Sequence, residues 1–126
     1  MKFTLGKNQK LKSRKAISQL FIEGNHMKSF PVKMIYLPNS DHEINTKVAF
    51  SVPKRNFKLA VDRNRIKRLL RESYRLNQYH FFEDHHESYN IMFIYMSNVM
   101  PSYDEVDHKL KKLMLKFKST FSPSNI

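Results

Sequence analysis

The sequence of 126 residues contains no cysteine, which excludes disulfide bonds and thiolate metal sites and fits a reducing compartment. Its two glycines, Gly6 and Gly24, are too few for a phosphate-binding P-loop or a GxGxxG dinucleotide turn. No run approaches the roughly 18 apolar residues that span a bilayer. Residues 1–7 also lack the long apolar segment of a signal peptide. We therefore expect a cytoplasmic protein.

Acidic residues are also scarce, because Asp and Glu number 11 against 23 Lys and Arg, which gives a net charge of +12. The imbalance lies in residues 1–75, which hold 18 basic and 5 acidic side chains. Residues 76–126 hold 5 basic and 6 acidic side chains. A charge confined to one part of the chain indicates a surface that faces a polyanion, either nucleic acid or an anionic membrane. Apolar residues make up 40% of the chain, so it can still bury a core.

Apolar periodicity and capping residues predict a single α+β domain over residues 1–126, with a basic arm at 1–12 and a frayed tail at 122–126. The predicted elements are a helix that Ser13 caps and Gly24 ends, strands at 30–37 and 47–52, a helix at 63–79 capped by Asp62, a strand at 89–96, and a final helix that begins with a Ser102–Glu105 capping box. One further short strand near the turn at 38–41 is left open. The strand at 89–96 is nearly all apolar, which is typical of an interior strand covered on both faces.

The helix at 63–79 separates apolar from basic side chains on a wheel of about 100° per residue. One side collects the residues expected in the core, which are Ile66, Leu69, Leu70, Ser73 and Leu76. The opposite side collects Asn64, Lys67, Arg68, Arg71 and Arg75, with Arg63 at the shoulder and Arg65 on the far flank. Neighbouring cations in this row lie about 5–6 Å apart, which is close to the repeat of phosphates along a nucleic-acid strand.

A solvated basic face is the ordinary explanation for such a row, but only Glu72 is available within this helix to neutralise it. A membrane surface is disfavoured because the apolar stripe lacks Trp and Phe and is needed for the core. Nucleic acid is therefore the better partner. The strands that flank the basic helix argue against a helix-turn-helix DNA reader, which requires a positioning helix.

A protein nuclease would need carboxylates or histidines arranged for metal binding or for acid–base catalysis. The densest candidate is the segment 83–87, Glu-Asp-His-His-Glu, which falls in a predicted loop and is better interpreted as solvated. Asp104, Glu105 and Asp107 fall in the predicted first turn of the last helix, where the helix dipole accounts for them. The pattern thus predicts no catalytic residue and no metal ligand on the protein.

A family resemblance is carried by residues 63–72, which read Arg-Asn-Arg-Ile-Lys-Arg-Leu-Leu-Arg-Glu and resemble the RNR signature of the bacterial ribonuclease P protein subunit. Residues 48–55 are similar to the strand that leads into that signature, and residues 11–24 are similar to the family's first helix. The resemblance implies an α-β sandwich with three helices on a mixed sheet of about four strands, in which a left-handed β-α-β crossover carries the RNR helix. It also implies a cofactor of the ribonuclease P holoenzyme, whose RNA subunit removes the 5′ leader of precursor tRNA with Mg²⁺.

The resemblance further implies two RNA-contacting surfaces on the protein. The residues implied to face the catalytic RNA are Lys54, Arg55, Arg63, Asn64, Arg65, Lys67, Arg68, Arg71 and Arg75. Those implied to line a cleft for the leader are Ile17, Phe21, Lys33, Ile35 and Ser51. Two features depart from the family pattern. The family often has aromatic residues at the positions of Ile17 and Ile35, and the loop 56–61 replaces a common Gly-Asn turn, so that Phe57 and Lys58 could supply contacts of their own.

The implied partners are the ribonuclease P RNA and the 5′ leader of precursor tRNA, with no DNA and no membrane, and the free protein is expected to be a monomer. No cofactor is expected on the protein side chains, since the required Mg²⁺ belongs to the RNA. The alternative function is a structural rRNA-binding protein of ribosomal type, which shares the size, the charge and the α+β architecture. An autonomous nuclease would have to cleave without any added RNA.

Overall fold

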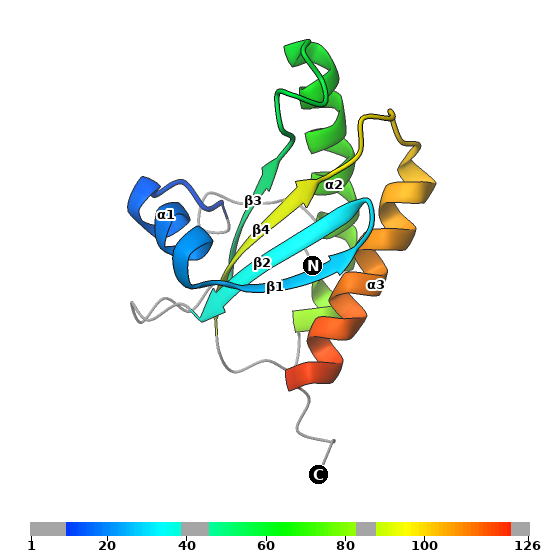
Figure 1. Ribbon diagram of the computed structural model, residues 1–126. Helices are drawn as coiled ribbons and strands as arrows, with labels where there is room; N and C mark the ends of the chain where they lie inside the picture. The colour runs from blue at the N-terminus through cyan, green and yellow to red at the C-terminus, as the bar shows by residue number, and fades with distance from the viewer. Residues whose placement is uncertain (1–9, 39–45, 83–87, 122–126) are drawn as a thin grey trace.

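The computed structural model describes residues 10–38, 46–82 and 88–121. Its elements, in chain order, are α1 (Arg14–Glu23), β1 (Asn25–Ser29), β2 (Val32–Pro38), β3 (Lys47–Ser51), α2 (Ala60–Phe82), β4 (Tyr89–Tyr95) and α3 (Tyr103–Phe121). Within these residues, four strands form one mixed sheet against which three helices pack (Figure 1), which confirms the predicted α+β class.

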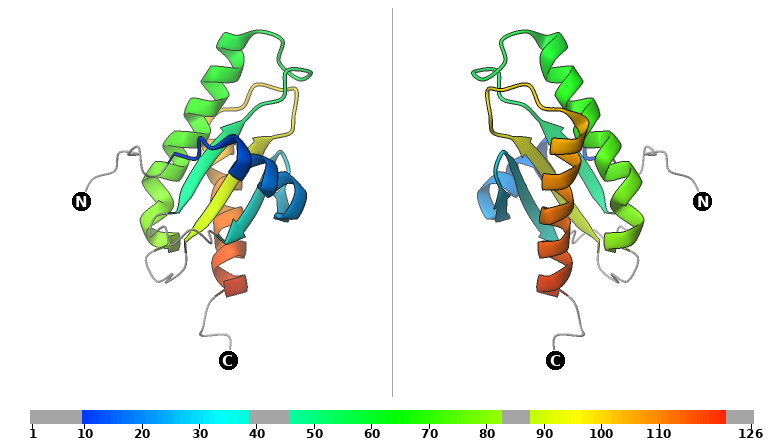
Figure 2. Two further views of the ribbon diagram at one scale, coloured as in Figure 1. Left: turned by 90° about the vertical axis from the view of Figure 1, so that its left-hand side faces the viewer. Right: turned by 90° about the vertical axis from the view of Figure 1, so that its right-hand side faces the viewer.

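The strand order across the sheet is β1-β2-β4-β3. β1 and β2 form an antiparallel hairpin, β2 pairs antiparallel with β4, and β4 pairs in parallel with β3. The chain runs from β3 through α2 into β4, so a β-α-β crossover joins these two neighbours. Seen from the side of α2 and α3 with the two strands pointing upward, β4 lies to the left of β3 (right panel of Figure 2). The crossover is therefore left-handed, against the usual rule.

Each face of the sheet has its own apolar cluster, because side chains alternate between the two faces along a strand. α2 and α3 cover one face, where Phe93 of β4 shares a cluster with Leu70 and Phe117. α1 covers the other face, where Leu20 shares a cluster with Met92 of β4. β4 is thus buried on both sides (Figure 2), as its nearly all-apolar sequence predicts.

The hairpin differs from the predicted single strand at 30–37. Residues 25–29 form β1, an edge strand that the pattern missed because it contains one large apolar side chain and is mostly exposed. Pro31 lies in the turn between β1 and β2, directly before the start of β2 and after a cis Phe30–Pro31 peptide bond. The turn at 38–41 falls largely outside the described residues.

α1 begins and ends where the sequence predicts. Ser13 Oγ accepts the Ala16 amide at 3.2 Å, and the Gly24 amide donates to the Leu20 carbonyl at 2.8 Å. A Cβ atom on residue 24 would collide with that carbonyl oxygen and would lie 2.5 Å from Ile35 Cγ2. Glycine therefore lets the end of α1 approach β2 closely.

The basic arm is shorter than the predicted 1–12. Lys10 forms a parallel bridge with Val48 of β3, and the Leu11 amide donates to the Val48 carbonyl at 2.9 Å. The Leu11 side chain is buried in the cluster beneath α1. Residues 10–12 therefore belong to the folded domain, which a lone leucine between lysines does not reveal in the sequence. Residues 1–9 and the predicted tail at 122–126 lie outside the described residues.

α2 begins three residues before the predicted start and ends three residues after the predicted end. Asp62 lies in its first turn rather than at the cap, and its carboxylate still favours the positive end of the helix dipole. The Leu59 carbonyl accepts the amides of Asp62 and Arg63, both at 3.2 Å. The helix thus starts from the loop backbone instead of from an aspartate cap.

α3 begins at its predicted N-cap. Ser102 Oγ accepts the Glu105 amide at 3.2 Å, as a capping box requires. The Glu105 carboxylate accepts the Ser102 hydroxyl, also at 3.2 Å, so the reciprocal contact reaches the side chain rather than the amide. The apolar side chains that α3 turns to the core are buried from Val106 to Phe117.

Candidate nucleic-acid interface

The loop between β3 and α2 is anchored in the core. Val52 and Phe57 are buried, and the Phe57 ring lies 6.2 Å from the ring of Tyr95 on β4. Phe57 therefore offers little surface for the contact that this loop could supply, because the core encloses its ring. The basic residues of this loop are exposed, and they are Lys54, Arg55 and Lys58.

Arg63 closes this loop onto the start of α2. Its Nη1 donates to the carbonyls of Phe57 at 2.7 Å and Lys58 at 2.9 Å. Two carbonyl acceptors fix a guanidinium in place, while its other N–H groups can still donate elsewhere. The structure thus gives Arg63 a positioning role at the beginning of the basic helix, in addition to the predicted RNA contact.

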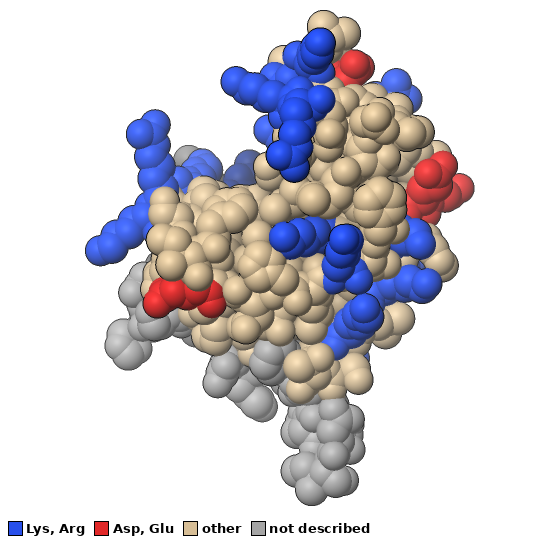
Figure 3. All heavy atoms as spheres, in the orientation of Figure 1, with Lys and Arg blue, Asp and Glu red and all other residues tan. Residues whose placement is uncertain are grey.

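The face of α2 opposite the core presents the predicted basic row. Lys67 is half-buried, and the exposed members are Asn64, Arg65, Arg68 and Arg71. The Arg71 guanidinium lies over the ring of Phe50 on β3, 5.7 Å from its centroid, which is within cation–π range. Figure 3 shows basic side chains gathered over the loop and the start of α2. Among the described residues, no carboxylate pairs with Arg65, Arg68 or Arg71.

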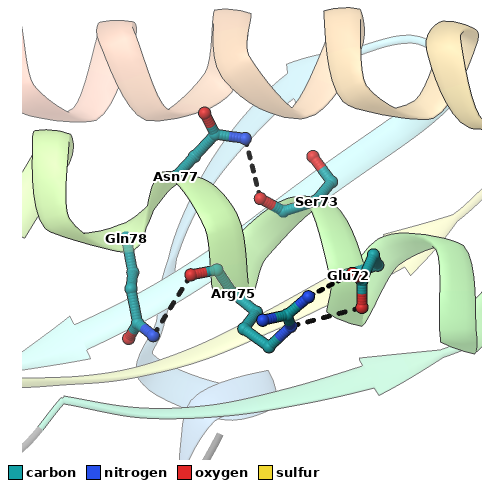
Figure 4. A network of polar contacts seen from close by, with 5 residues as sticks. All are labelled: Glu72, Ser73, Arg75, Asn77 and Gln78. Atoms are coloured by element: carbon teal, nitrogen blue, oxygen red, sulfur yellow. Dashed lines mark hydrogen bonds and ion pairs between the residues drawn. The ribbon is translucent and has the colours of Figure 1, made fainter. Parts of the chain in front are cut away.

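The row is neutralised at its far end by Glu72, the one acidic residue between Arg63 and Phe82. Arg75 Nε donates to Glu72 Oε2 at 3.2 Å, and Arg75 Nη2 pairs with Glu72 Oε1 (Figure 4). The hydrogen bond with Glu72 raises the pKa of Arg75 above its ordinary value. Arg75 is therefore partly neutralised within the protein, whereas the cations nearer the start of α2 are not.

The core side of α2 differs from the predicted stripe in its second half. Ile66 and Ser73 are fully buried as expected, but Leu76 is 42% exposed. Tyr74 and Asn77 are buried in its place. The buried stripe is centred on the line from Ile66 to Asn77, and residue 76 lies about 100° away from that line on the wheel. The helix therefore buries two polar residues, Ser73 and Asn77, on the side that packs against α3.

These two polar residues meet Asp107 of α3. Ser73 Oγ donates to Asp107 Oδ1 at 2.7 Å, and Asn77 Nδ2 donates to the same oxygen at 3.0 Å. Asn77 Nδ2 also donates to the Ser73 carbonyl at 2.7 Å (Figure 4). Lys111 pairs with Asp107 Oδ2 at 2.9 Å. Partial burial opposes ionisation of Asp107, but these hydrogen bonds outweigh it and lower the carboxyl pKa.

Asp107 therefore corrects a prediction. The sequence assigns it to the first turn of α3 and to the helix dipole, but the acidic residues of that turn are Asp104 and Glu105. Asp107 lies one residue beyond and joins α3 to the buried side of the basic helix. The spacing of Ser73 and Asn77, four residues apart on the buried side of α2, is the signal in the sequence that could have revealed this partner.

Part of the predicted leader surface lies on the α1 side of the sheet. Lys33 of β2 and Ser51 of β3 are both half-buried. They stand in register on either side of Ile94 of β4, because Lys33 pairs with Ile94 and Ile94 pairs with Ser51. One row across the sheet therefore places an ammonium and a hydroxyl on either side of a buried isoleucine.

The other predicted leader residues differ from one another in accessibility. Phe21 on α1 is 49% exposed, so its ring is available to a ligand. Ile17 is partly buried against the cluster under α1. Ile35 is fully buried in that cluster and offers no surface to RNA. We therefore treat Ile35 as a support for α1 instead of a leader contact.

An open hollow of about 740 Å³ lies at the start of α2, lined by Val61, Asp62, Asn64, Arg65 and Arg68. Its two guanidinium groups can each hold two phosphate oxygens. The part of the chain that the structure describes contains no group of three or more His, Asp or Glu side chains placed to hold a metal ion. No helix in it is long and apolar enough to cross a membrane. The segment 83–87 lies outside the described residues.

The sequence profile of the family described as Ribonuclease P matches residues 5–118. The chain belongs to the ribonuclease P protein family. It is 34% identical over 119 residues to the ribonuclease P protein component of Porphyromonas gingivalis strain W83, covering 90% of this chain and 86% of that protein. The RNase P protein of Staphylococcus aureus has the same fold at 19% identity, with a TM-score of 0.73 over 90% of this chain and 98% of the other. The RNase P protein of Thermotoga maritima also has this fold, at 20% identity and with a TM-score of 0.69. The match covers 85% of this chain and 96% of the other.

Membership makes this chain an RNA-binding protein component of ribonuclease P, the ribonuclease of tRNA processing. It confirms the family that residues 63–72 and the segments before them indicate. The individual RNA-contacting residues stay predictions. The sequence did not predict two residues that support the basic helix. Phe50 contacts Arg71 with its ring, and Asp107 accepts a hydrogen bond from Ser73.

Proposed function

We propose that this ribonuclease P protein binds the catalytic RNA through the exposed face of α2 and the preceding loop. The 5′ leader of precursor tRNA binds along the α1 side of the sheet. The RNA subunit carries out the cleavage and holds the Mg²⁺ that the reaction requires. The protein neutralises phosphates and positions the leader, and its side chains take no nucleophilic or acid–base part.

One observation carries this proposal: among residues 10–38, 46–82 and 88–121, no carboxylate pairs with Arg65, Arg68 or Arg71, although the other side of the helix is fixed in the core. Unpaired like charges three and four residues apart repel one another, so the row costs stability until a polyanion binds. Arginine also matches phosphate geometry with its planar fork. Because Phe50 already holds Arg71 and the helix is already packed, little order has to be created on binding.

The leader contact is supported by Phe21, Lys33 and Ser51. A single-stranded leader offers unstacked bases, and an aromatic ring that is half-exposed can stack on one of them. Lys33 lies on the same side of the sheet and can neutralise a leader phosphate. The substitution of isoleucine for the family's aromatics at residues 17 and 35 leaves Phe21 as the stacking residue in this set.

Reconstitution tests the proposed function. Adding the purified protein to ribonuclease P RNA at low Mg²⁺ should increase the rate of 5′-leader removal about tenfold or more, because the protein supplies cations that Mg²⁺ otherwise supplies. The rate is measured on end-labelled precursor tRNA. Cleavage by the protein without RNA would contradict the proposal in favour of an autonomous nuclease. Tight rRNA binding with no effect on ribonuclease P RNA would favour the structural ribosomal-type protein.

A further inference from the structure

A second group of cations lies on α3, away from the basic face of α2. From Lys109 to residue 126 the sequence contains five lysines and no acidic residue. Lys109, Lys112 and Lys116 are spaced i, i+3 and i+7, so they lie on one side of the helix. We name these three residues the α3 lysine ridge. Figure 3 shows basic side chains over β1 and α3 as a group separate from the one at the start of α2.

The ridge lies beside the edge strand β1. Lys116 Nζ donates to the Lys28 carbonyl at 3.3 Å, and both lysine side chains are exposed. An open hollow of about 440 Å³ between the helix and the strand is lined by Ser29, Lys112, Leu115, Lys116 and Ser119. Two ammonium groups and the Ser29 hydroxyl therefore offer hydrogen-bond donors around one space.

The ridge takes part in no ion pair within the part of the chain that the structure describes. Among the described residues, no carboxylate pairs with Lys112 or Lys116. Lys111 lies on the other side of α3, toward α2, where it pairs with Asp107 at 2.9 Å. Lys118 follows Lys111 by seven residues and lies on that same side. One helix thus carries the three ridge lysines on one side and Lys111 and Lys118 on the other, and within the described part of the chain only the α2 side includes an ion-paired lysine.

We infer that the α3 lysine ridge binds the phosphate backbone of a second RNA segment, without reading its sequence. β1 and β3 are the two edges of the sheet, and Arg71 lies over Phe50 of β3. The ridge lies beside β1 and the basic row beside β3, and Figure 3 shows the two basic groups apart on the surface, so the two meet different stretches of RNA. The inference rests on the proposed function, since it gives the same protein a second contact with RNA.

The chemistry of the ridge favours RNA over other anionic partners. Lysine provides a mobile point charge, which suits a backbone of variable geometry. It is depleted from the centres of protein–protein interfaces, which disfavours an acidic protein. A membrane surface requires an exposed apolar face, but the apolar side of α3 is buried. Leu115 is the only large apolar side chain described on α3 that is exposed.

The test compares two variants that lose the same charge from the same helix. Lys112→Gln/Lys116→Gln removes the two ridge lysines that line the hollow, and the control Lys111→Gln/Lys118→Gln removes two lysines from the other side. Affinity for ribonuclease P RNA and for an RNA hairpin of unrelated sequence is measured between about 50 and 200 mM salt. Circular dichroism and thermal melting verify that each variant is folded.

The ridge variant should make the slope of log affinity against log salt shallower by about 1.4–1.8 for both RNAs, because two phosphate contacts are lost. Over that salt range the wild type should therefore lose about tenfold more affinity than the ridge variant. The control variant should change the slope much less. Equal slopes for the ridge variant and the wild type would overturn the inference, as would equal effects of the two variants.

Two further outcomes distinguish this inference from a membrane-binding role and from the proposed function. Binding to vesicles of anionic phospholipid that is lost in Lys112→Gln/Lys116→Gln, while both RNA slopes are unchanged, would overturn it in favour of a membrane. If the proposed function fails instead, the wild-type protein does not stimulate cleavage by ribonuclease P RNA. Hairpin binding that is weakened in the ridge variant would then show that the ridge binds RNA, which distinguishes a failure of the proposed function from a failure of the ridge.

Discussion

Replacing Arg68 and Arg71 together by glutamine should weaken binding to ribonuclease P RNA about a hundredfold at low Mg²⁺. Both side chains are exposed on α2. A hydrogen bond to a charged group is worth about 1.5–3 kcal/mol, and about 1.4 kcal/mol is a tenfold change in affinity. Two lost phosphate contacts therefore amount to a factor of about one hundred or more. Titration of labelled RNA and the rate of leader removal measure the effect.

High Mg²⁺ should restore much of the activity of Arg68→Gln/Arg71→Gln, because the divalent ion screens the same RNA phosphates. The matched control is Lys111→Gln/Lys118→Gln, which removes two charges outside both proposed RNA surfaces and should leave the cleavage rate within about twofold of the wild type. Near-wild-type binding of the arginine variant would contradict the assigned role of this face. A defect in a folded variant that Mg²⁺ does not relieve would contradict phosphate as the ligand.

Replacing Asp107 by alanine should lower the free energy of unfolding by about 2–4 kcal/mol. The change removes the oxygen that Ser73 and Asn77 share and the carboxylate that pairs with Lys111. Ser73 is fully buried and Asn77 is 8% exposed, and a buried donor that loses its acceptor costs about 1–3 kcal/mol. Urea denaturation measures the change. RNA binding should be lost together with the fold, since α2 carries the basic row.

The Asp107→Asn variant separates the contribution of the carboxylate charge to stability from that of side-chain size, because asparagine is nearly the same size but uncharged. The lowered pKa of Asp107 means that its ionised form stabilises the folded state at a pH above the unfolded pKa of about 3.9. That contribution is lost as the pH falls through the lower pKa of the folded state. The wild type should therefore exceed Asp107→Asn in stability at neutral pH, and the two should converge below about pH 4. A constant difference down to acid pH would assign the effect to shape alone.

Local patterns in the sequence were sufficient for most of the elements, because caps and apolar periodicity depend on near neighbours. Ser13, Gly24 and Ser102 mark helix ends where the structure has them. β1 was not predicted, because an exposed edge strand lacks the alternation of apolar and polar residues that indicates a strand. The strand order also could not be read from the residues, since β2 pairs with β4 from the other half of the chain. The left-handed crossover was implied by the family resemblance alone.

The basic row of α2 was predictable for a similar reason, since a helical wheel shows which residues share a face. The partner of each side chain was not predictable, because partners come from other elements. Arg63 turns back to the loop carbonyls, and Ile35 is covered by α1. Asp107 is shared by two residues of α2 that lie about thirty positions earlier in the chain. Such contacts depend on how the layers of the fold pack.

The salt dependence of binding between the wild-type protein and ribonuclease P RNA tests the central claim most directly. That claim is that the unpaired cations of α2 bind RNA phosphates. If about six phosphates are neutralised, the slope of log affinity against log salt should be about −4 to −5 at the single-strand coefficient. Specific binding whose affinity barely changes with salt would contradict the account.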